Sequence, residues 1–216
     1  MSTHRCNPIA PPSAAQAILR AAEHLFSDKG FDAASVNEIA RKARVSKANV
    51  FHHFGCKRDL YLAVLRSACE ESSSALFRDV AHTQSAYPER LRSFAYGHLQ
   101  SLLAHQSASW LMLRAVIEEP TADGSALAER VFGDNFERLV TLIREGQHSG
   151  FIRGDLDPAA LVVLLIGADV FFFQTREVLR HLPAVGFADD PKRFSSTWWD
   201  VFWTGVAAQP QVSVQE

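Results

Sequence analysis

Hydrophobic and polar positions along most of the chain follow the 3.6-residue period of an α-helix. In the segment 14–28 the apolar side chains form a single stripe, and Gly30 then marks the end of the segment. The pattern predicts an amphipathic helix with one buried face. The stripe consists of Ile18, Leu19, Ala22, Leu25 and Phe26.

Two short helices joined by a tight turn are predicted next. Ser35 is followed three residues later by Glu38, which is the sequence of a capping box, and a second helix start follows at Ser46. Helices this short are stable only when they pack on neighbours. The three segments therefore predict a three-helix helix-turn-helix core, after which Gly55 breaks the chain.

The remainder of the chain also reads as helix. A long helix opens at residues 56–59 and continues toward Ala81, and no alternating strand pattern or internal repeat follows it. The predicted fold class is all-α, with a flexible arm (1–13), a helix-turn-helix domain (14–60), a larger helical domain (61–208) and a flexible tail (209–216). Further helices are expected at 88–105, 109–118, 125–148, 158–181 and 193–207.

Composition places the chain among ordinary globular proteins, with 47% hydrophobic and 21% charged residues. The longest apolar run, 161–173, contains Asp169 and falls short of the roughly 20 residues of a membrane span, so we expect a buried helix there and no membrane partner.

The first residues lack a signal-peptide core, which favours the cytoplasm. The three cysteines have neither disulfide nor zinc spacing, so reduced thiols are expected. No metal or other cofactor is predicted.

Charge is distributed unevenly along the chain. Residues 1–60 carry nine Lys and Arg against five Asp and Glu, whereas residues 61–216 carry thirteen against nineteen, and the net charge is -2. A basic first quarter followed by an acidic remainder suggests that one end meets a polyanion and the other end a different partner.

Residues 14–65 resemble the N-terminal domain of the tetracycline-repressor (TetR) family. The matching elements are LFSDKGFDAASV, the IA pair of the second helix, VSKAN, VFHHF and GCKRDLYLAVL, in this order and spacing. The resemblance implies a dimeric DNA-binding transcriptional regulator, most often a repressor that a small-molecule effector releases from its operator.

The start of the third helix holds the candidate DNA-reading side chains, which are Ser46, Lys47, Ala48 and Asn49. A helix whose first turn exposes such residues fits the major groove, where Asn pairs with adenine, Lys reads guanine or holds a phosphate, and Ala meets a thymine methyl. Helix capping by the serine and a solvated helix face are the structural alternatives.

Other residues around this helix are expected to position the DNA backbone. His52 and His53 follow on the groove side, and Ser35 and Lys57 lie at helix starts, where phosphate is favoured. Arg44, in the turn, is also a candidate DNA contact; it stands where the family usually has Gly, which predicts a positive φ at a non-glycine residue.

Two more departures from the family pattern concern side-chain chemistry. Phe51 replaces the usual Tyr, and we expect it to serve packing alone. Cys56 replaces the usual Ser as the N-cap of the long helix, beside Lys57 and Arg58; cations there favour a reactive thiolate, so a redox switch and a plain substitution are both open.

By resemblance, the acidic remainder is the effector-binding and dimerisation domain. The segment GFIRGDLDPAALVVLLIGADVFFFQ is similar to the penultimate helix of such regulators, which pairs with the last helix across a two-fold axis. Aromatic side chains of the last helix are favoured at interface cores, with an internal core as the alternative. The predicted dimer contacts are Leu161, Leu165, Phe173, Trp198 and Phe202.

An effector pocket is expected among the central helices, where apolar walls carry a few polar groups. Arg114 and Asp169 interrupt apolar runs, so each is expected to be paired, mutually or locally, or to touch a ligand. The predicted pocket residues are Tyr96, His98, Trp110, Met112, Arg114, Phe172 and Gln174.

Two other functions are alternatives to a DNA-binding regulator. An enzyme is disfavoured because the sequence contains no His-Glu-x-x-His, no Gly-rich phosphate loop and no nucleophile elbow. A helical ligand-carrier or interaction protein remains the alternative, although it has no need of small polar and basic residues at one helix start.

Overall fold

The structure is a computed structural model and describes residues 13–82, 86–118 and 124–208. In this part of the chain every regular element is a helix, apart from an isolated bridge between Ile152 and Ala207. The all-α prediction is therefore confirmed. The predicted arm, except Ser13, and the whole predicted tail lie outside the described residues.

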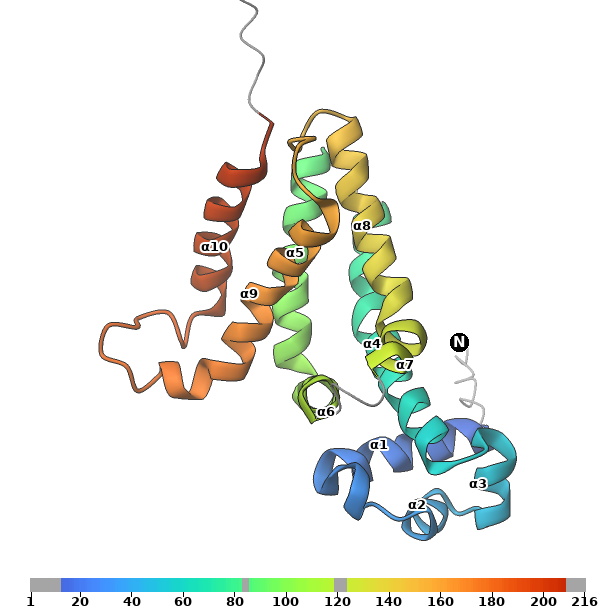
Figure 1. Ribbon diagram of the computed structural model, residues 1–216. Helices are drawn as coiled ribbons and strands as arrows, with labels where there is room; N and C mark the ends of the chain where they lie inside the picture. The colour runs from blue at the N-terminus through green and yellow to red at the C-terminus, as the bar shows by residue number, and fades with distance from the viewer. Residues whose placement is uncertain (1–12, 83–85, 119–123, 209–216) are drawn as a thin grey trace, which may run out of the picture. The chain divides into compact units, whose positions relative to one another are not determined.

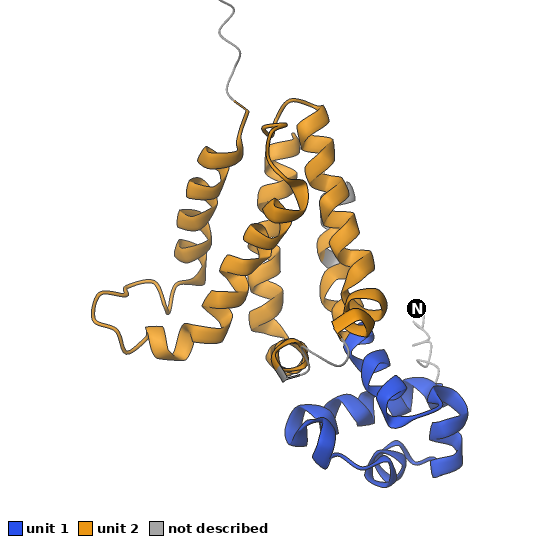
Figure 2. Ribbon diagram, viewed as in Figure 1, with its two compact units in different colours: residues 1–67 blue, residues 68–216 orange. Residues whose placement is uncertain are grey.

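The chain divides into two compact units, residues 1–67 and 68–216 (Figure 2). The boundary falls inside helix α4 (Lys57–His82), and the predicted domain boundary after residue 60 lies in the same helix. Each unit has its own buried apolar core.

The first unit contains α1 (Ala14–Ala33), α2 (Val36–Ala43), α3 (Lys47–Phe54) and the beginning of α4 (Figure 1). Helix α1 starts with a capping box at Ser13 and was predicted to stop at Gly30. Gly30 breaks the helical geometry, with φ of 79°, as predicted, and a short helical segment follows it up to Ala33.

The core of the first unit forms where the apolar stripe of α1 meets α2, α3 and α4. Ile18, Phe26, Ile39 and Val50 are essentially inaccessible to solvent. The ring of Phe26 also meets Tyr61 edge to face, with 5.1 Å between ring centroids. Packing of this kind holds two eight-residue helices that would not be stable alone.

The second unit contains the remainder of α4 and six further α-helices, with a five-residue π-helical segment between two of them. Helix α5 packs against α9 and α10, and α8 packs against α9 (Figure 1). Proline occupies the first turn of α5, α9 and α10. The helices are α5 (Tyr87–Ala104), α6 (Gln106–Glu118), α7 (Gly124–Leu127), α8 (Gly133–His148), α9 (Pro158–Leu179) and α10 (Pro191–Val206).

The single helix predicted for 125–148 is interrupted by a π-helical segment, Ala128–Phe132, between α7 and α8. A Cβ atom on Gly133 would lie 2.6 Å from the carbonyl oxygen of Ala128. Only glycine therefore fits at this position without a shift of the backbone. Periodicity could not reveal the interruption because a π turn changes the register by less than a full turn.

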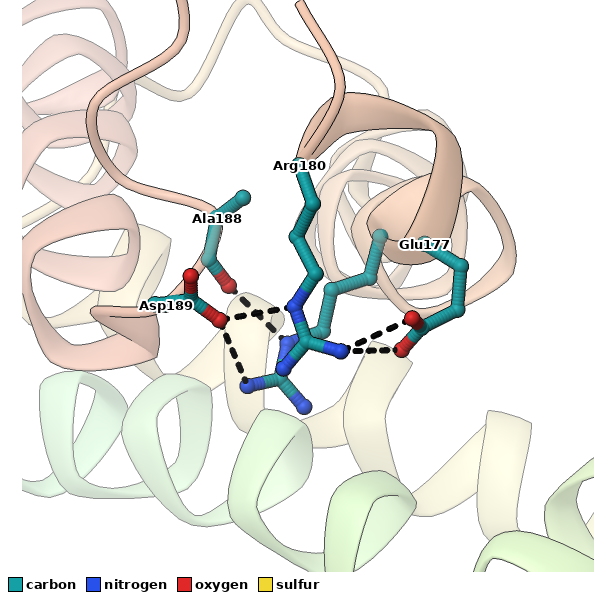
Figure 3. A network of polar contacts seen from close by, with 5 residues as sticks. Glu177, Arg180, Ala188 and Asp189 are labelled. Atoms are coloured by element: carbon teal, nitrogen blue, oxygen red, sulfur yellow. Dashed lines mark hydrogen bonds and ion pairs between the residues drawn. The ribbon is translucent and has the colours of Figure 1, made fainter.

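The loop between α9 and α10 is tied down by two arginines from the end of α9 (Figure 3). Arg180 donates from Nε to Asp189 Oδ1 at 2.7 Å and from Nη1 to both carboxylate oxygens of Glu177. Arg176 Nε donates to the carbonyl oxygen of Ala188 at 2.9 Å. These bonds fix where the chain turns back into α10.

Helix α9 lies within the helix predicted for 158–181. Its 22 residues, with a mean hydropathy of 1.8 in the most apolar window, are enough by length and composition to cross a membrane. One side of the helix, however, packs in the second unit and carries the buried Asp169. These contacts are those of a core helix with one side left exposed.

Candidate nucleic-acid interface and internal cavity

Side-chain caps fix both short helices of the helix-turn-helix segment. Ser35 Oγ accepts from the Glu38 amide at 3.2 Å, and Glu38 Oε2 accepts from the Ser35 amide at 3.2 Å, so the predicted capping box is confirmed. Ser46 Oγ accepts from the Asn49 amide at 3.1 Å. Both serines therefore cap, and the start of α3 is held rigidly.

The turn between α2 and α3 places Arg44 in the left-handed region, with φ of 58° and ψ of 40°. The predicted positive φ is confirmed. Its amide donates to the carbonyls of Ala40 and Arg41, which ends α2 at the turn. A residue with a Cβ atom holds this conformation at a cost of order 1 kcal/mol.

Replacing Arg44 by Gly should therefore stabilise the protein by about 0.5–1 kcal/mol while weakening DNA binding, because it relieves strain and removes an exposed charge. Arg44→Ala is the matched control, since it loses the same charge and keeps the Cβ atom. Urea unfolding and DNA titration separate the two effects. Equal stability of the Gly and Ala variants would contradict the strain.

Helix α3 presents an exposed face made of the predicted residues. Lys47, Ala48, His52 and His53 are exposed, and Asn49 is half-buried. Phe51 was expected to serve packing alone, but its ring is 38% exposed and lies under the ammonium of Lys47, 5.8 Å from the ring centroid. The exposed face thus contains the ring of Phe51, which was expected to pack inside the protein.

Lys57 and the preceding Cys56, at the start of α4, already have hydrogen-bond partners within the chain. Lys57 Nζ donates to the carbonyl of Asp32 at 3.1 Å and sits 4.5 Å from the ring centroid of Phe31. Cys56 Sγ accepts from the Asp59 amide, as an N-cap does, and lies 3.0 Å from Asp59 Oδ2. The thiol thus donates to the Asp59 carboxylate, which does not favour a thiolate, and the redox switch stays a hypothesis.

Glu38 makes an ion pair in addition to its cap. Lys29 Nζ lies 2.6 Å from Glu38 Oε1. The hydrogen bond from Lys29, followed by those from Ser35, lowers the pKa of Glu38 from 4.5 to about 2. A carboxylate with a depressed pKa stabilises the folded state above its unfolded pKa, and the contribution is lost as the pH falls.

Acid unfolding should reveal this contribution. The stability of the native protein should fall between pH 4.5 and about 2 as Glu38 is protonated, and Glu38→Gln should lose part of that dependence. Glu71→Gln, an exposed glutamate on α4, is the control. Identical pH profiles of the native protein and the Glu38→Gln variant would contradict the role of Glu38.

The second unit encloses a cavity of about 380 Å³ between α4, α5, α6, α8 and α9. Its walls are mainly aliphatic and aromatic, with a small number of polar side chains. A few polar groups in an apolar cavity are typical of small-molecule sites. The polar lining residues are Cys69, Ser72, Ser73, His98, Ser101, Ser109 and Asn135.

The predicted pocket residues lie in different surroundings. His98 and Met112 line the cavity, whereas Phe172 is fully buried and stacks on Phe194 at 4.3 Å between ring centroids. Tyr96 lies beside Arg92, 5.4 Å from ring centroid to guanidinium carbon. The other three are exposed: Trp110, Arg114 and Gln174.

Asp169 is buried and hydrogen-bonded by two other helices. His98 Nδ1 lies 2.9 Å from Asp169 Oδ2, and Trp198 Nε1 donates to Asp169 Oδ1 at 3.1 Å. Burial raises the pKa of Asp169, while the bonds from His98 and Trp198 oppose the rise. Asp169 is therefore paired with His98 rather than with Arg114, and the network joins α5, α9 and α10.

Three of the predicted dimer contacts face their own core. Leu161, Leu165 and Phe173 are at most 6% exposed, so they are not available to a second chain. The apolar residues that α9 does expose occupy another face and were missed because nearly the whole helix is apolar. They are Val163, Leu164, Phe171 and Val178, and each is more than half exposed.

Among the described residues, no three His, Cys, Asp or Glu side chains come together in a group able to hold a metal ion.

Comparison with known proteins places the first unit in a known family. Residues 18–64 match the family model of bacterial regulatory proteins of the tetR family. The HTH-type transcriptional activator FasR of Mycolicibacterium smegmatis is 40% identical over 76 residues, which are 35% of this chain and 34% of that protein. This match therefore spans about a third of the relative's length.

Other matches extend over most of the chain. The HTH-type transcriptional repressor NicS of Pseudomonas putida is 23% identical over 185 residues, covering 84% of each chain. The crystal structure of a TetR family transcription regulator from Marinobacter aquaeolei VT8 superposes with a TM-score of 0.69 at 18% identity, covering 91% of this chain and 96% of that chain.

The relatives that match a capped helix-turn-helix unit followed by a larger helical unit are named as transcriptional activators and repressors. The helix-turn-helix unit of this chain is thus similar to that of the tetR family of bacterial regulatory proteins.

Proposed function

We propose that the chain is a repressor that binds a palindromic operator as a homodimer and is released by a small-molecule effector. The observation that carries the proposal is the exposed, rigidly capped start of α3, with Lys47 and Ala48 in the first turn. A recognition helix reads base edges with these first residues.

The roles of the DNA contacts follow from side-chain chemistry. Lys47 and Asn49 read bases, Ala48 contacts a thymine methyl, and Arg44, His52 and His53 approach phosphates. Ser35 and Ser46 keep their caps and add phosphate contacts at the helix starts. Lys57 contributes less, because its ammonium already binds the carbonyl of Asp32.

A homodimer forms through the exposed apolar face of α9, with α10 beside it. Val163, Leu164, Phe171 and Val178 supply apolar surface that a monomer would leave in water. Trp198 and Phe202 of α10, both half-buried, stay in the proposed interface, whereas Leu161, Leu165 and Phe173 do not. Two copies related by a two-fold axis match the symmetry of a palindrome.

The effector occupies the cavity of the second unit. Residues of α4 line this cavity, and the same helix begins in the helix-turn-helix unit. Ligand and operator then favour different conformations of the dimer, and each weakens the binding of the other. We place the protein in the cytoplasm, where the operator is. A ligand carrier without DNA binding is the rival function.

Selection of bound fragments from a random duplex pool at fixed, near-physiological salt tests the proposal, since phosphate contacts make affinity depend on salt. Enrichment of an inverted repeat with half-sites about one helical turn apart, or a multiple of it, supports the dimeric repressor. A pool without any enriched sequence overturns it and favours the carrier.

A further inference from the structure

We infer that the cavity takes an uncharged, mostly apolar alcohol or phenol, whose hydroxyl group donates a hydrogen bond to a polar lining group. The inference rests on the proposed effector role of the cavity and adds the chemical class of the ligand. It depends on three properties of the lining: its charge, its hydrogen-bonding capacity and its size.

The lining offers no counter-charge to an ionic ligand. Among the described lining residues there is no Lys, Arg, Asp or Glu, and burial raises the pKa of the Cys69 thiol, which keeps it neutral. Arg138 stacks on the lining residue Phe77 but is itself exposed and does not line the cavity. A carboxylate or ammonium group placed here would lose its hydration without a partner.

The hydroxyl groups of the lining already donate to the backbone. Ser72 Oγ donates to the Ala68 carbonyl at 2.7 Å, and Ser109 Oγ donates to the Leu102 carbonyl at 3.1 Å. Ser101 Oγ likewise donates to the carbonyl of Ser72 at 3.2 Å. A hydroxyl whose proton is used in this way offers only its lone pairs to a ligand.

The His98 ring, like the serine hydroxyl groups, offers an acceptor to a ligand. Asp169 accepts a hydrogen bond from Trp198 Nε1 at one carboxylate oxygen and from His98 Nδ1–H at the other, which favours the Nδ1–H tautomer of the ring. In the neutral ring Nε2 is then an acceptor. The amide of Asn135 donates one proton to Cys69 Sγ at 3.2 Å and retains an acceptor oxygen.

Apart from the second amide N–H of Asn135 and the thiol S–H of Cys69, the polar lining offers acceptors, so acceptors outnumber donors. A ligand that carries a donor satisfies these acceptors, whereas a ketone, ester or ether would leave them unpaired in an apolar site. The volume of about 380 Å³ is roughly that of a dozen water molecules, so a ligand of about a dozen non-hydrogen atoms fits.

Three probes of matched shape test the inference: 4-hexylphenol, 4-hexylanisole and 4-hexylbenzoate. Isothermal titration of the full-length protein should show the phenol binding about 10-fold more tightly than the anisole, which lacks the donor. The benzoate should bind more weakly still because it is charged. Equal affinities for the phenol and the anisole, tighter binding of the benzoate, or no binding of any probe would overturn the inference.

A variant locates the acceptor. In His98→Asn the amide nitrogen can still donate to Asp169, but the Nε2 acceptor is gone, so the preference for the phenol should shrink toward unity. His148→Asn on the exposed end of α8 is the matched control and should keep the preference. An unchanged preference in a folded His98→Asn variant would overturn the role of His98.

Failure of the inference and failure of the proposed function give different results. The titrations need no DNA, so a phenol preference without any operator binding would sustain the ligand class and reject the repressor. If the protein binds the operator but binds the phenol and the anisole equally, the repressor function stands and the ligand class is rejected.

Discussion

The Lys47→Ala/Asn49→Ala variant should lose operator affinity by roughly 100-fold or more, because each base contact of this kind contributes about 1–3 kcal/mol of discrimination. The substitutions leave the fold intact, since the cap of α3 uses the main-chain amide of Asn49 and Lys47 is exposed. Titration of a labelled operator at fixed salt, with circular dichroism as a check of folding, measures the loss.

The matched control for this variant is Asn37→Ala/Lys192→Ala, which removes the same two residue types from exposed positions of α2 and α10. It should bind the operator within a few-fold of the native protein. If both double variants lose the same affinity, binding depends on bulk charge and not on the start of α3, and the assignment of the recognition residues fails.

The Phe171→Asp variant should be monomeric and should bind the operator at least 100-fold more weakly. Phe171 is 62% exposed in the chain, so a carboxylate there does not disturb the core of the protomer. In a dimer interface the same carboxylate would be buried without a partner, and two copies would face each other across the two-fold axis. Light scattering after gel filtration gives the mass, and operator titration gives the affinity.

Ile117→Asp serves as the control, because Ile117 is 57% exposed on α6 and lies outside the proposed interface. This variant should remain dimeric. A dimeric Phe171→Asp protein would show that the exposed face of α9 is not the interface. A different surface would then have to set the separation of the two recognition helices.

Sequence alone predicted the first unit well because its signals are local. The capping serines, Ser35 and Ser46, act within four residues of themselves, and the short turn at Arg44 leaves few possible geometries. The exposure of Phe51 was missed because it depends on how α3 packs on its neighbours. An aromatic residue in a short helix gives no indication of which side it occupies.

The second unit was predicted only at the level of its helices. The apolar run of α9 continues around its circumference, so the sequence could not separate Leu161 and Leu165, which are buried, from Leu164 and Phe171, which are exposed. The cavity gathers residues from five helices, so its lining depends on long-range packing. Of the predicted pocket residues, only His98 and Met112 lie on its wall.

Methylation interference on the selected operator tests the central claim most directly, since it probes guanine N7 in the major groove. The proposed dimer predicts two symmetric clusters of interference about 10 base pairs apart, or a multiple of that spacing, as two recognition helices require. A single cluster, or interference confined to minor-groove positions, would contradict the reading of DNA by paired α3 helices.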